Sequence, residues 1–435
     1  MIHKIVFAAR NLTSNAGLFL LLENAKANGI FDLIDHDLVF DNTSTNKIKL
    51  NHIKTMLCGH FIGIDRLERI KLLQGDPLIE AFGISVKEPE TVSRFLSNFN
   101  FKTTQMMRDI NFKVFKKLLA KSRLKTITID IDSSVVNVEG HQEGAVKGYN
   151  PKSPGNNCYS LQFAFCDELK AYMTGFVRSG NTYTANGAAE LIKEIVAQIT
   201  CACGTGAGKT DDLEILFRMD SGYFDDDIIT TIESAGCQYL IKGKEYPTLT
   251  SQVTAPTISF MKGEEGRETT ELVTKLDIWD KDRRFVVSRV LKPEKDRAQL
   301  SFLEGNDFEY FYFVTNTEVS SEKVVVAYEK RGNAENYIST PKGHKEAKYD
   351  MAVGRLLLKS FWANEAIFQM MMLSYNLFLL FKFDFLGISE FRQQIKTFRL
   401  KYVFLAGKII RTARYVVMKL PAKYPFRDVY EKCMA

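Results

Sequence analysis

Acidic residues lie at the predicted ends of two strands and on one predicted helix of this 435-residue chain. Asp132 closes a run in which polar and apolar residues alternate, and Asp220 directly follows the apolar run Leu213–Met219. Glu335 lies on a predicted helix whose face is polar. Carboxylate oxygens are preferred ligands of Mg²⁺, and two such ions about 4 Å apart can activate an attacking oxygen and stabilise a leaving one. If the three acids meet, the sequence predicts a two-metal centre.

The predicted helix that carries Glu335 presents charged and aromatic side chains at a regular spacing. Tyr328, Arg331 and Glu335 stand at i, i+3 and i+7, so they share one side of a helix. Pro341 should end the helix and leave Lys342 just beyond it as a free cation. The spacing favours a charged partner on this side, although an exposed helix with incidental charges is the simpler interpretation.

The spacing of these four residues resembles the Y-R-E-K signature of bacterial insertion-sequence transposases, which carry a DDE catalytic triad on an RNase H-like fold. The resemblance covers most of the chain, from about residue 50 to residue 345. It implies that Tyr328, Arg331 and Lys342 contact phosphates and bases at the end of the mobile element. A guanidinium suits a bidentate contact to phosphate, and a tyrosine ring suits stacking on a displaced base.

The two aspartates lie in local sequences that are similar to the same family. Residues 130–134 read Asp-Ile-Asp-Ser-Ser, and the family's first aspartate precedes a short Ser/Thr pair. Residues 218–224 read Arg-Met-Asp-Ser-Gly-Tyr-Phe, which is similar to the family's R-x-D-x-G-[FY] setting. The resemblance implies that Asp132, Asp220 and Glu335 are the catalytic residues and hold two Mg²⁺ ions, with Mn²⁺ as a substitute.

The identity of the first metal ligand has two candidates. Asp130 and Asp132 face the same side of one predicted strand, because side chains alternate with a period of two. Either carboxylate could bind the metal. The serine pair that follows Asp132 favours that residue.

From residue 124 the hydrophobic pattern changes from a helical period to that of strands. In an RNase H-like fold the first and fourth strands are neighbours, so the two aspartates at their ends should converge. The predicted order is a strand over 124–132, strands over 159–166 and 171–177, a helix over 185–199, a strand over 213–219, a helix over 224–235 and a strand over 237–242.

The predicted fold class is α+β with several domains. Two short helices, near the turn at Gly75-Asp76-Pro77 and at Pro89, could form a helix-turn-helix reader, and a basic helix is expected over 391–420. The predicted regions are a helical N-terminal DNA-binding or dimerisation region (1–122), the first part of an RNase H-like core (123–243), a β-rich insertion (244–325), the catalytic helix that completes the core (326–345) and a helical basic C-terminal region (346–435).

The composition is that of a soluble protein inside the cell. Seven cysteines, an odd number without framework spacing, indicate reduced thiols and a cytoplasmic location. No signal peptide is evident at the N-terminus. The most lipid-like run, Ala366–Phe381, is short for a membrane span and carries Gln369, Ser374 and Asn376, so we expect a buried helix and no membrane.

The net charge of +6 hides two basic stretches. Residues 391–435 carry eleven Lys or Arg against two acidic residues, and residues 101–125 carry eight against one. Such stretches on an otherwise acidic chain favour a polyanionic partner, although charge runs are often only solvated helix faces.

These observations lead to a Mg²⁺-dependent insertion-sequence transposase as the expected function. The enzyme would cut DNA at the terminal inverted repeats and join the freed 3′ end to target DNA. The family leads us to expect a homodimer in the synaptic complex. A metal-dependent nuclease without strand transfer, or a non-catalytic DNA-binding regulator on the same scaffold, are the alternatives.

Overall fold

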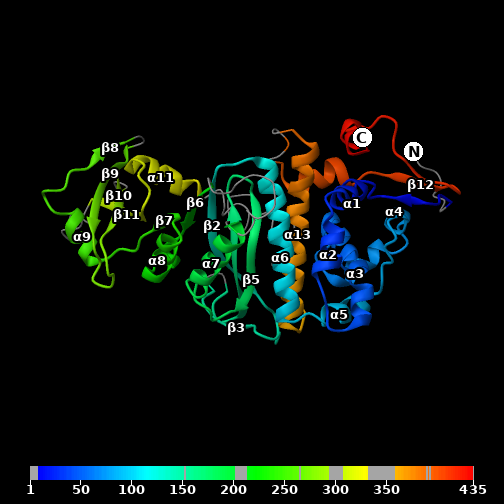
Figure 1. Ribbon diagram of the computed structural model, residues 1–435, viewed down its shortest axis with the longest axis horizontal. Coiled ribbons are helices and arrows are strands. Elements are labelled where there is room, and N and C mark those ends of the chain that lie inside the picture. The colour runs from blue at the N-terminus through cyan, green and yellow to red at the C-terminus, as the bar shows by residue number, and fades with distance from the viewer. Residues whose placement is uncertain are drawn as a thin grey trace.

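The structure is a computed structural model that describes residues 8–150, 153–200, 213–263, 266–292, 307–331, 358–387, 390 and 393–434. The molecule is elongated, with a β-rich end, a mixed centre and a helical end that also holds the C-terminus (Figure 1). Among the sequence predictions, Glu335 and Lys342 lie outside the described residues.

A ten-stranded sheet forms the centre and the β-rich end, with the order β3-β4-β2-β6-β7-β11-β10-β9-β8 and β5 on β4. The core strands alternate with helices in the predicted order βββαβαβ, and their spatial order β5-β4-β2-β6-β7 places the first strand beside the fourth. The RNase H-like prediction is thus confirmed. The core elements are β2 (Thr126–Asn137), β3 (Val146–Lys147), β4 (Asn157–Cys166), β5 (Ala171–Ser179), α7 (Ala188–Thr200), β6 (Glu214–Met219), α8 (Asp226–Ser234) and β7 (Gln238–Lys242).

Strand β2 pairs in parallel with β6 on one side and antiparallel with β4 on the other. Its isoleucines 127, 129 and 131 are fully buried, as the period-two pattern predicts. The prediction that this strand ends at Asp132 is wrong. Strand β2 continues to Asn137 because residues 133–137 pair with residues 158–162 of β4. Asp132 nevertheless lies where the parallel partner stops, since the last β2–β6 pair is Ile131 with Met219.

The predicted insertion contributes strands to the same sheet. Strand β11 pairs antiparallel with β7, with Val314 opposite Ile241, so hydrogen bonding continues from the core without a break. Helix α11 packs over β7, β9 and β10 through Val324 and Val325. The elements are α9 (Pro247–Val253), β8 (Met261–Lys262), β9 (Glu268–Thr274), β10 (Arg283–Leu291), β11 (Phe308–Thr315) and α11 (Ser321–Glu329).

Helices precede the sheet, as expected. Local capping fixes their starts: the Asn42 side chain accepts from the backbone N–H groups of Ser44 and Thr45, and Asn100 forms a capping box with Thr103. The elements before the sheet are β1 (Leu12–Thr13), α1 (Leu18–Ala27), α2 (Ile30–Asp37), α3 (Thr43–Ile62), the 3₁₀ helix η1 (Leu67–Leu73), α4 (Pro77–Ala81), α5 (Pro89–Leu96) and α6 (Phe101–Ser122). The two helices suggested as a helix-turn-helix reader are α4 and α5, and DNA reading by them stays a prediction.

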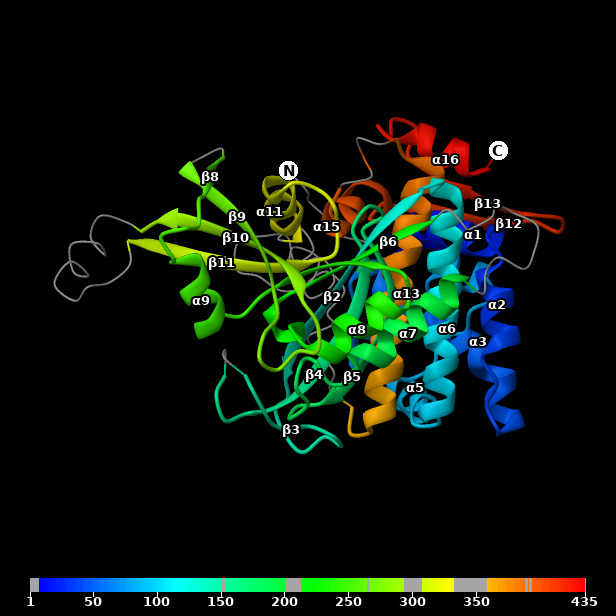
Figure 2. The ribbon, with the colours of Figure 1, turned by 60° about the vertical axis from the view of Figure 1, so that its left-hand side comes forward.

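Helix α13 (Phe361–Phe385) lies in the middle of the molecule, packed on α6, α3 and β5 (Figures 1 and 2). Its length and mean hydropathy of 1.4 would suit a membrane span, but 94% of its most apolar window is buried inside the protein. The expectation of a buried helix is therefore confirmed.

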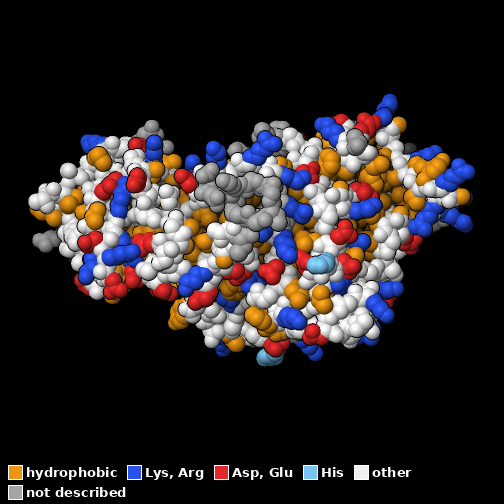
Figure 3. Space-filling view, viewed as in Figure 1, with side chains coloured by type: hydrophobic (Ala, Val, Ile, Leu, Met, Phe, Trp, Pro, Cys, Tyr) orange, Lys and Arg blue, Asp and Glu red, His pale blue; other side chains and the backbone are white. Residues whose placement is uncertain are grey.

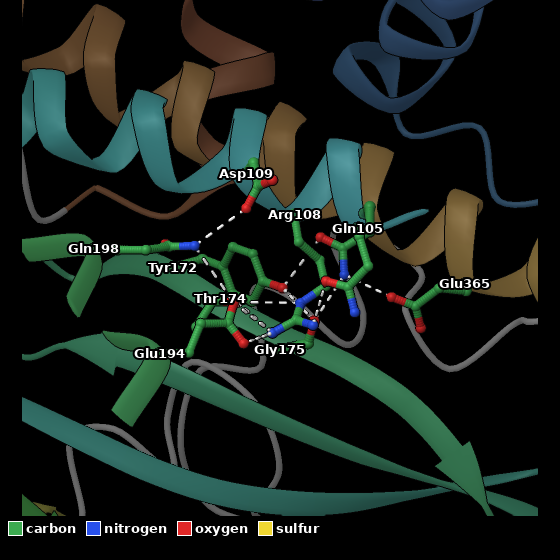
Figure 4. A network of polar contacts seen from close by, with 10 residues as sticks. Gln105, Arg108, Asp109, Tyr172, Thr174, Gly175, Glu194, Gln198 and Glu365 are labelled. Carbon is green, nitrogen blue, oxygen red and sulfur yellow. Dashed lines mark hydrogen bonds and ion pairs between the residues drawn. The ribbon is translucent and has the colours of Figure 1, made fainter. Parts of the chain in front are cut away.

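Polar side chains join α13 to its neighbours. Arg108 of α6 donates to Glu194 of α7 at 2.7 Å and to Thr174 of β5 (Figure 4). Glu365 of α13 accepts from the backbone N–H of Val177 at 2.5 Å. These contacts connect three helices and one strand through a single network.

The expected basic helix over 391–420 is wrong. The chain forms two short helical turns and then a hairpin, because Ile409, Ile410, Val416 and Val417 are β-branched and favour strands. Strand β12 pairs with β13 and also with β1, which makes a separate three-stranded sheet. The elements are α15 (Ile395–Phe398), the π-helical turn η7 (Arg399–Val403), β12 (Gly407–Arg411), β13 (Val416–Lys419) and α16 (Arg427–Met434).

Candidate active site

Asp132 and Asp220 stand side by side on adjacent strands. Each follows one member of the last parallel β2–β6 pair, Ile131 and Met219. Carboxyl ends of parallel strands meet at one edge of the sheet, and ligand sites in such sheets lie there. The structure thus brings together two of the three predicted catalytic acids.

Backbone N–H groups orient both carboxylates. The N–H of Ser133 donates to Asp132 Oδ1 at 2.8 Å. The N–H of Gly222 donates to Asp220 Oδ1 at 2.8 Å, where the aspartate caps the short 3₁₀ turn η4 (Ser221–Tyr223). A Cβ at position 222 would lie 2.9 Å from Asp220 Oδ1 and 3.0 Å from Thr184 Cγ2, so glycine is needed at this close approach.

Arg331 connects the two aspartates. Its Nη2 lies 3.1 Å from Asp132 Oδ1 and 3.7 Å from Asp220 Oδ2. The Arg331 side chain is 6% exposed, that of Asp132 14% and that of Asp220 37%, so Asp220 is the most accessible of the three. Burial alone would lower the pKa of Arg331, but the neighbouring Asp132, Tyr328 and Asp220 raise it, and the guanidinium stays charged. The two carboxylates therefore stabilise a positive charge at the position of the Arg331 guanidinium.

Asp130 has a different environment from Asp132. Arg218 of β6 donates to it twice, from Nε at 2.7 Å and from Nη2 at 2.8 Å, and both side chains are almost fully buried. Burial raises the pKa of Asp130 to about 6, against the opposing effect of Arg218, so the carboxylate is charged at neutral pH. Arg218 also contacts Asp167 at 3.0 Å and the carbonyl of Ala327 at 2.6 Å. Its contacts hold α11 against the sheet, next to the two accessible aspartates.

A further set of polar residues supports the site, and the sequence analysis did not find it. The hydroxyl of Thr184 lies 3.3 Å from that of Ser133, and Gln162 donates to the carbonyl of Thr184 at 3.1 Å. Tyr223 is fully buried, and burial raises the pKa of its hydroxyl. Arg178 donates to the carbonyl of Tyr183 at 3.1 Å. The available signal was the presence of Gln162 and Arg178 at buried positions of otherwise apolar strands.

The helix that carries the signature begins earlier than expected. Helix α11 starts at Ser321 and ends at Glu329, and Arg331 follows it. Tyr328 is half-buried and packs on Phe313 with ring centroids 5.0 Å apart. The Tyr328 ring thus faces the sheet of the insertion, whereas the Arg331 guanidinium faces Asp132 and Asp220.

The donor set fits a divalent cation. Two carboxylates that converge on one cationic group offer the hard oxygen ligands that Mg²⁺ and Mn²⁺ bind. Within the ranges that the structure describes, no group of three His, Cys, Asp or Glu side chains could hold a metal ion, so a third protein ligand would have to come from outside them.

Comparisons with known proteins give one family. A sequence model of the family described as transposase DDE domain group 1 matches residues 4–435. A search of curated proteins finds no match. Among solved structures, the chain is similar to that of a piggyBac transposase synaptic complex with hairpin DNA, at 10% identity and a TM-score of 0.37, over 87% of this chain and 81% of that one.

Proposed function

The chain belongs to the transposase DDE domain group 1 family, and we propose that it is the transposase of an insertion sequence. Members of this class generally use divalent metal ions. The proposed reaction is Mg²⁺-dependent cleavage of the phosphodiester backbone at the terminal inverted repeats, followed by strand transfer into target DNA. Mn²⁺ would substitute for Mg²⁺. The proposed partners are element and target DNA, with a homodimer in the synaptic complex.

Asp132 and Asp220 are proposed as the metal ligands that the described residues supply, with Glu335 as the third. Two bound cations would activate the attacking oxygen and stabilise the leaving one. The chain's own part is positioning. Ser133 and Gly222 fix the two carboxylates through their N–H groups. Asp130 is better explained as the partner of Arg218, which favours Asp132 as the first ligand.

Arg331, Tyr328 and Lys342 are proposed as DNA contacts. Arg331 contacts the carboxylates in this structure. The guanidinium suits a phosphate of the substrate by its charge and by its fork of donors. The role of Lys342 rests on the spacing of the signature alone.

The observation that carries the proposal is the side-by-side placement of Asp132 and Asp220 around one cationic group. Asp132 and Asp220 are 88 positions apart in the sequence but follow paired residues of adjacent strands, which supports their proposed role as ligands of one metal site.

A plasmid assay tests the proposal. Supercoiled DNA that carries the flanking sequence of the gene is incubated with protein and Mg²⁺, and the products are nicked, linear or joined species. We expect joined products from the wild type, and loss of all cleavage from Asp132→Asn, Asp220→Asn and Glu335→Gln with DNA binding retained.

The products separate the alternatives. Cleavage without joined products would favour a nuclease. Full activity of any of the three variants would disprove that residue's assignment, and binding without cleavage by the wild type would favour a regulator. Glu329→Gln, on the exposed end of α11, is the matched control and should cut at the wild-type rate.

A further inference from the structure

The two basic stretches of the sequence differ sharply in the structure. In α6, Arg108 pairs with Glu194 at 2.7 Å and Lys113 with Asp37 at 2.6 Å, and Lys121 pairs with Asp384. With Lys102, which lies 3.8 Å from Asp41, half of the eight basic residues of this stretch are in ion pairs, and three of these pairs join α6 to α2, α7 and α13.

Within the C-terminal stretch, the segment that contains the hairpin keeps most of its positive charge without ion pairs. Between Phe404 and Tyr424 the chain has five basic residues and no acidic one. Within the described part of the chain, four of them have no ion pair, and the fifth, Arg411, reaches only Glu80 at 4.0 Å with both side chains more than half exposed. The five residues are Lys408, Arg411, Arg414, Lys419 and Lys423.

The register of the hairpin places like charges against each other. Lys408 of β12 lies directly opposite Lys419 of β13, and both are exposed. Like charges directly opposite across two strands destabilise the pairing. The neighbouring pair, Ile409 and Met418, faces the protein, with Ile409 1% exposed. The outer face of the hairpin therefore concentrates positive charge at a cost to its own stability.

The turn of the hairpin extends this basic surface. Arg411 and Arg414 flank it, and Tyr415 is 62% exposed. The turn is ordered by its own hydrogen bonds, since Thr412 N–H donates to the Tyr415 carbonyl at 2.9 Å and the Tyr415 N–H donates to the Thr412 hydroxyl at 3.1 Å. Figure 3 shows Lys and Arg side chains gathered at the end of the molecule where β12 lies in Figure 1.

We propose that the β12–β13 hairpin is a duplex-binding ribbon that grips DNA away from the phosphodiester to be cut. The major groove of DNA, about 12 Å wide, admits a two-stranded ribbon. The hairpin is two-stranded beyond Lys408, because β1 pairs only with Gly407 and Lys408, and phosphates of the duplex would neutralise the opposed lysines. Figures 1 and 2 place β2 and β6 on the other side of α6 and α13 from the hairpin. The inference rests on the proposed function for its choice of DNA as the polyanion.

The test compares two variants that each remove two exposed cations. Lys408→Ala with Lys419→Ala removes the opposed pair. Arg427→Ala with Lys432→Ala is the matched control on α16, because those residues already pair with Glu431 at 2.5 Å and Asp428 at 3.8 Å. Full-length proteins are titrated onto a fluorescent 40-base-pair duplex of arbitrary sequence at several salt concentrations.

We expect the hairpin variant to bind at least about tenfold more weakly, with a slope of log affinity against log salt that is flatter by about 0.9 for each lost phosphate contact. Its melting temperature should stay level or rise, because the opposed charges are gone. The α16 control should keep the wild-type slope. Equal slopes for the two variants would overturn the proposal, as would a preference of the wild type for phosphatidylglycerol vesicles over duplex at equal phosphate concentration.

The result stands apart from the test of the proposed function. Binding through the hairpin without any cleavage would reject the transposase proposal and keep the ribbon. If the wild type cuts and joins DNA but the hairpin variant binds duplex with unchanged affinity, the transposase proposal is kept and the ribbon proposal is rejected.

Discussion

At the scale of single residues, Arg331 decides how the acidic pair behaves without metal. Its guanidinium contacts Asp132 at 3.1 Å and Asp220 at 3.7 Å, so a metal ion must compete with a resident cation. Arg331→Gln leaves two carboxylates facing each other, and we expect the variant to lose about 1–3 kcal/mol of stability in EDTA. It should bind Mn²⁺ more tightly than the wild type. Calorimetric titration and melting curves with and without Mn²⁺ measure both effects.

The control for this prediction is the adjacent Lys330→Ala. Lys330 is exposed, so its removal should change neither melting in EDTA nor Mn²⁺ affinity by much. Unchanged or weaker Mn²⁺ binding by the Arg331 variant would show that the guanidinium does not compete for the site.

Asp130 and Asp132 should respond differently to the same substitution. Asp130→Asn leaves Arg218 buried without its bidentate partner, and breaking such a pair costs on the order of 3–5 kcal/mol. Asp132→Asn removes one of the two acids that contact Arg331 and should cost only about 1–3 kcal/mol of unfolding free energy, while cleavage is lost. If the Asp130 variant unfolded at the wild-type urea concentration, the structural role of that aspartate would be wrong.

The sequence could predict that Asp132 and Asp220 lie close together because strand periodicity and turn signals are local, and strand order then places two strand positions side by side. It favoured Asp132 over Asp130 only through the serine pair that follows Asp132, because both aspartates face one side of the predicted strand. The choice depends on Arg218, which reaches Asp130 only after β6 pairs with β2. Thr184 was missed for the same reason, since its contact with Ser133 spans 51 residues.

At the scale of elements, the turn after β6 holds Asp220 in place. Gly222→Ala would put a Cβ 2.9 Å from Asp220 Oδ1, so the carboxylate must shift. We expect cleavage in the plasmid assay to fall about 10- to 100-fold, the usual effect of disturbing a group that orients a metal ligand. The free energy of unfolding should change by only about 1 kcal/mol.

Gly59→Ala inside α3 is the matched control. A Cβ there would meet its nearest neighbour at 3.6 Å, an ordinary contact, and alanine suits a helix better than glycine. This variant should cut normally and unfold at a slightly higher urea concentration. If Gly222→Ala cut DNA at the wild-type rate, the turn after β6 would not be needed to position Asp220.

The elements that the sequence predicted least well are at the C-terminus. The basic run over 391–420 has the spacing of a solvated helix, but its β-branched residues at 409–410 and 416–417 lie on two strands that pair across a turn, with Ile410 opposite Val417. Pairing with β1, which begins at Leu12, completes that sheet, and a contact across the whole chain cannot be read from a local pattern. The same holds for the insertion, whose place in the core sheet depends on β11 meeting β7.

At the scale of the whole molecule, α13 joins the helical end to the sheet, and a buried acid sits at that junction. Glu365, which Figure 4 labels on α13, is 2% exposed. It accepts from Val177 N–H and from Gln369 Nε2 at 2.8 Å. Burial raises its pKa from 4.5 to about 7, although those hydrogen bonds and the charge of Arg108 oppose the rise. The folded protein therefore holds a proton that the unfolded chain releases at lower pH.

This proton makes stability depend on pH. Between about pH 4.5 and 7 the folded state binds more protons at Glu365 than the unfolded state does, so stability falls as pH rises and then levels off. The full effect is on the order of 3 kcal/mol.

Glu365→Gln keeps the shape of the side chain but removes the titration. In urea unfolding of both proteins from pH 4.5 to 8, the unfolding free energy of the variant relative to the wild type should rise between about pH 4.5 and 7 and stay constant above pH 7. Glu190→Gln, on the exposed side of α7, is the control and should run parallel to the wild type. Parallel curves for Glu365→Gln as well would mean that the carboxyl is ionised throughout, held by Val177, Gln369 and Arg108, and that the junction between the helices and the sheet does not sense pH.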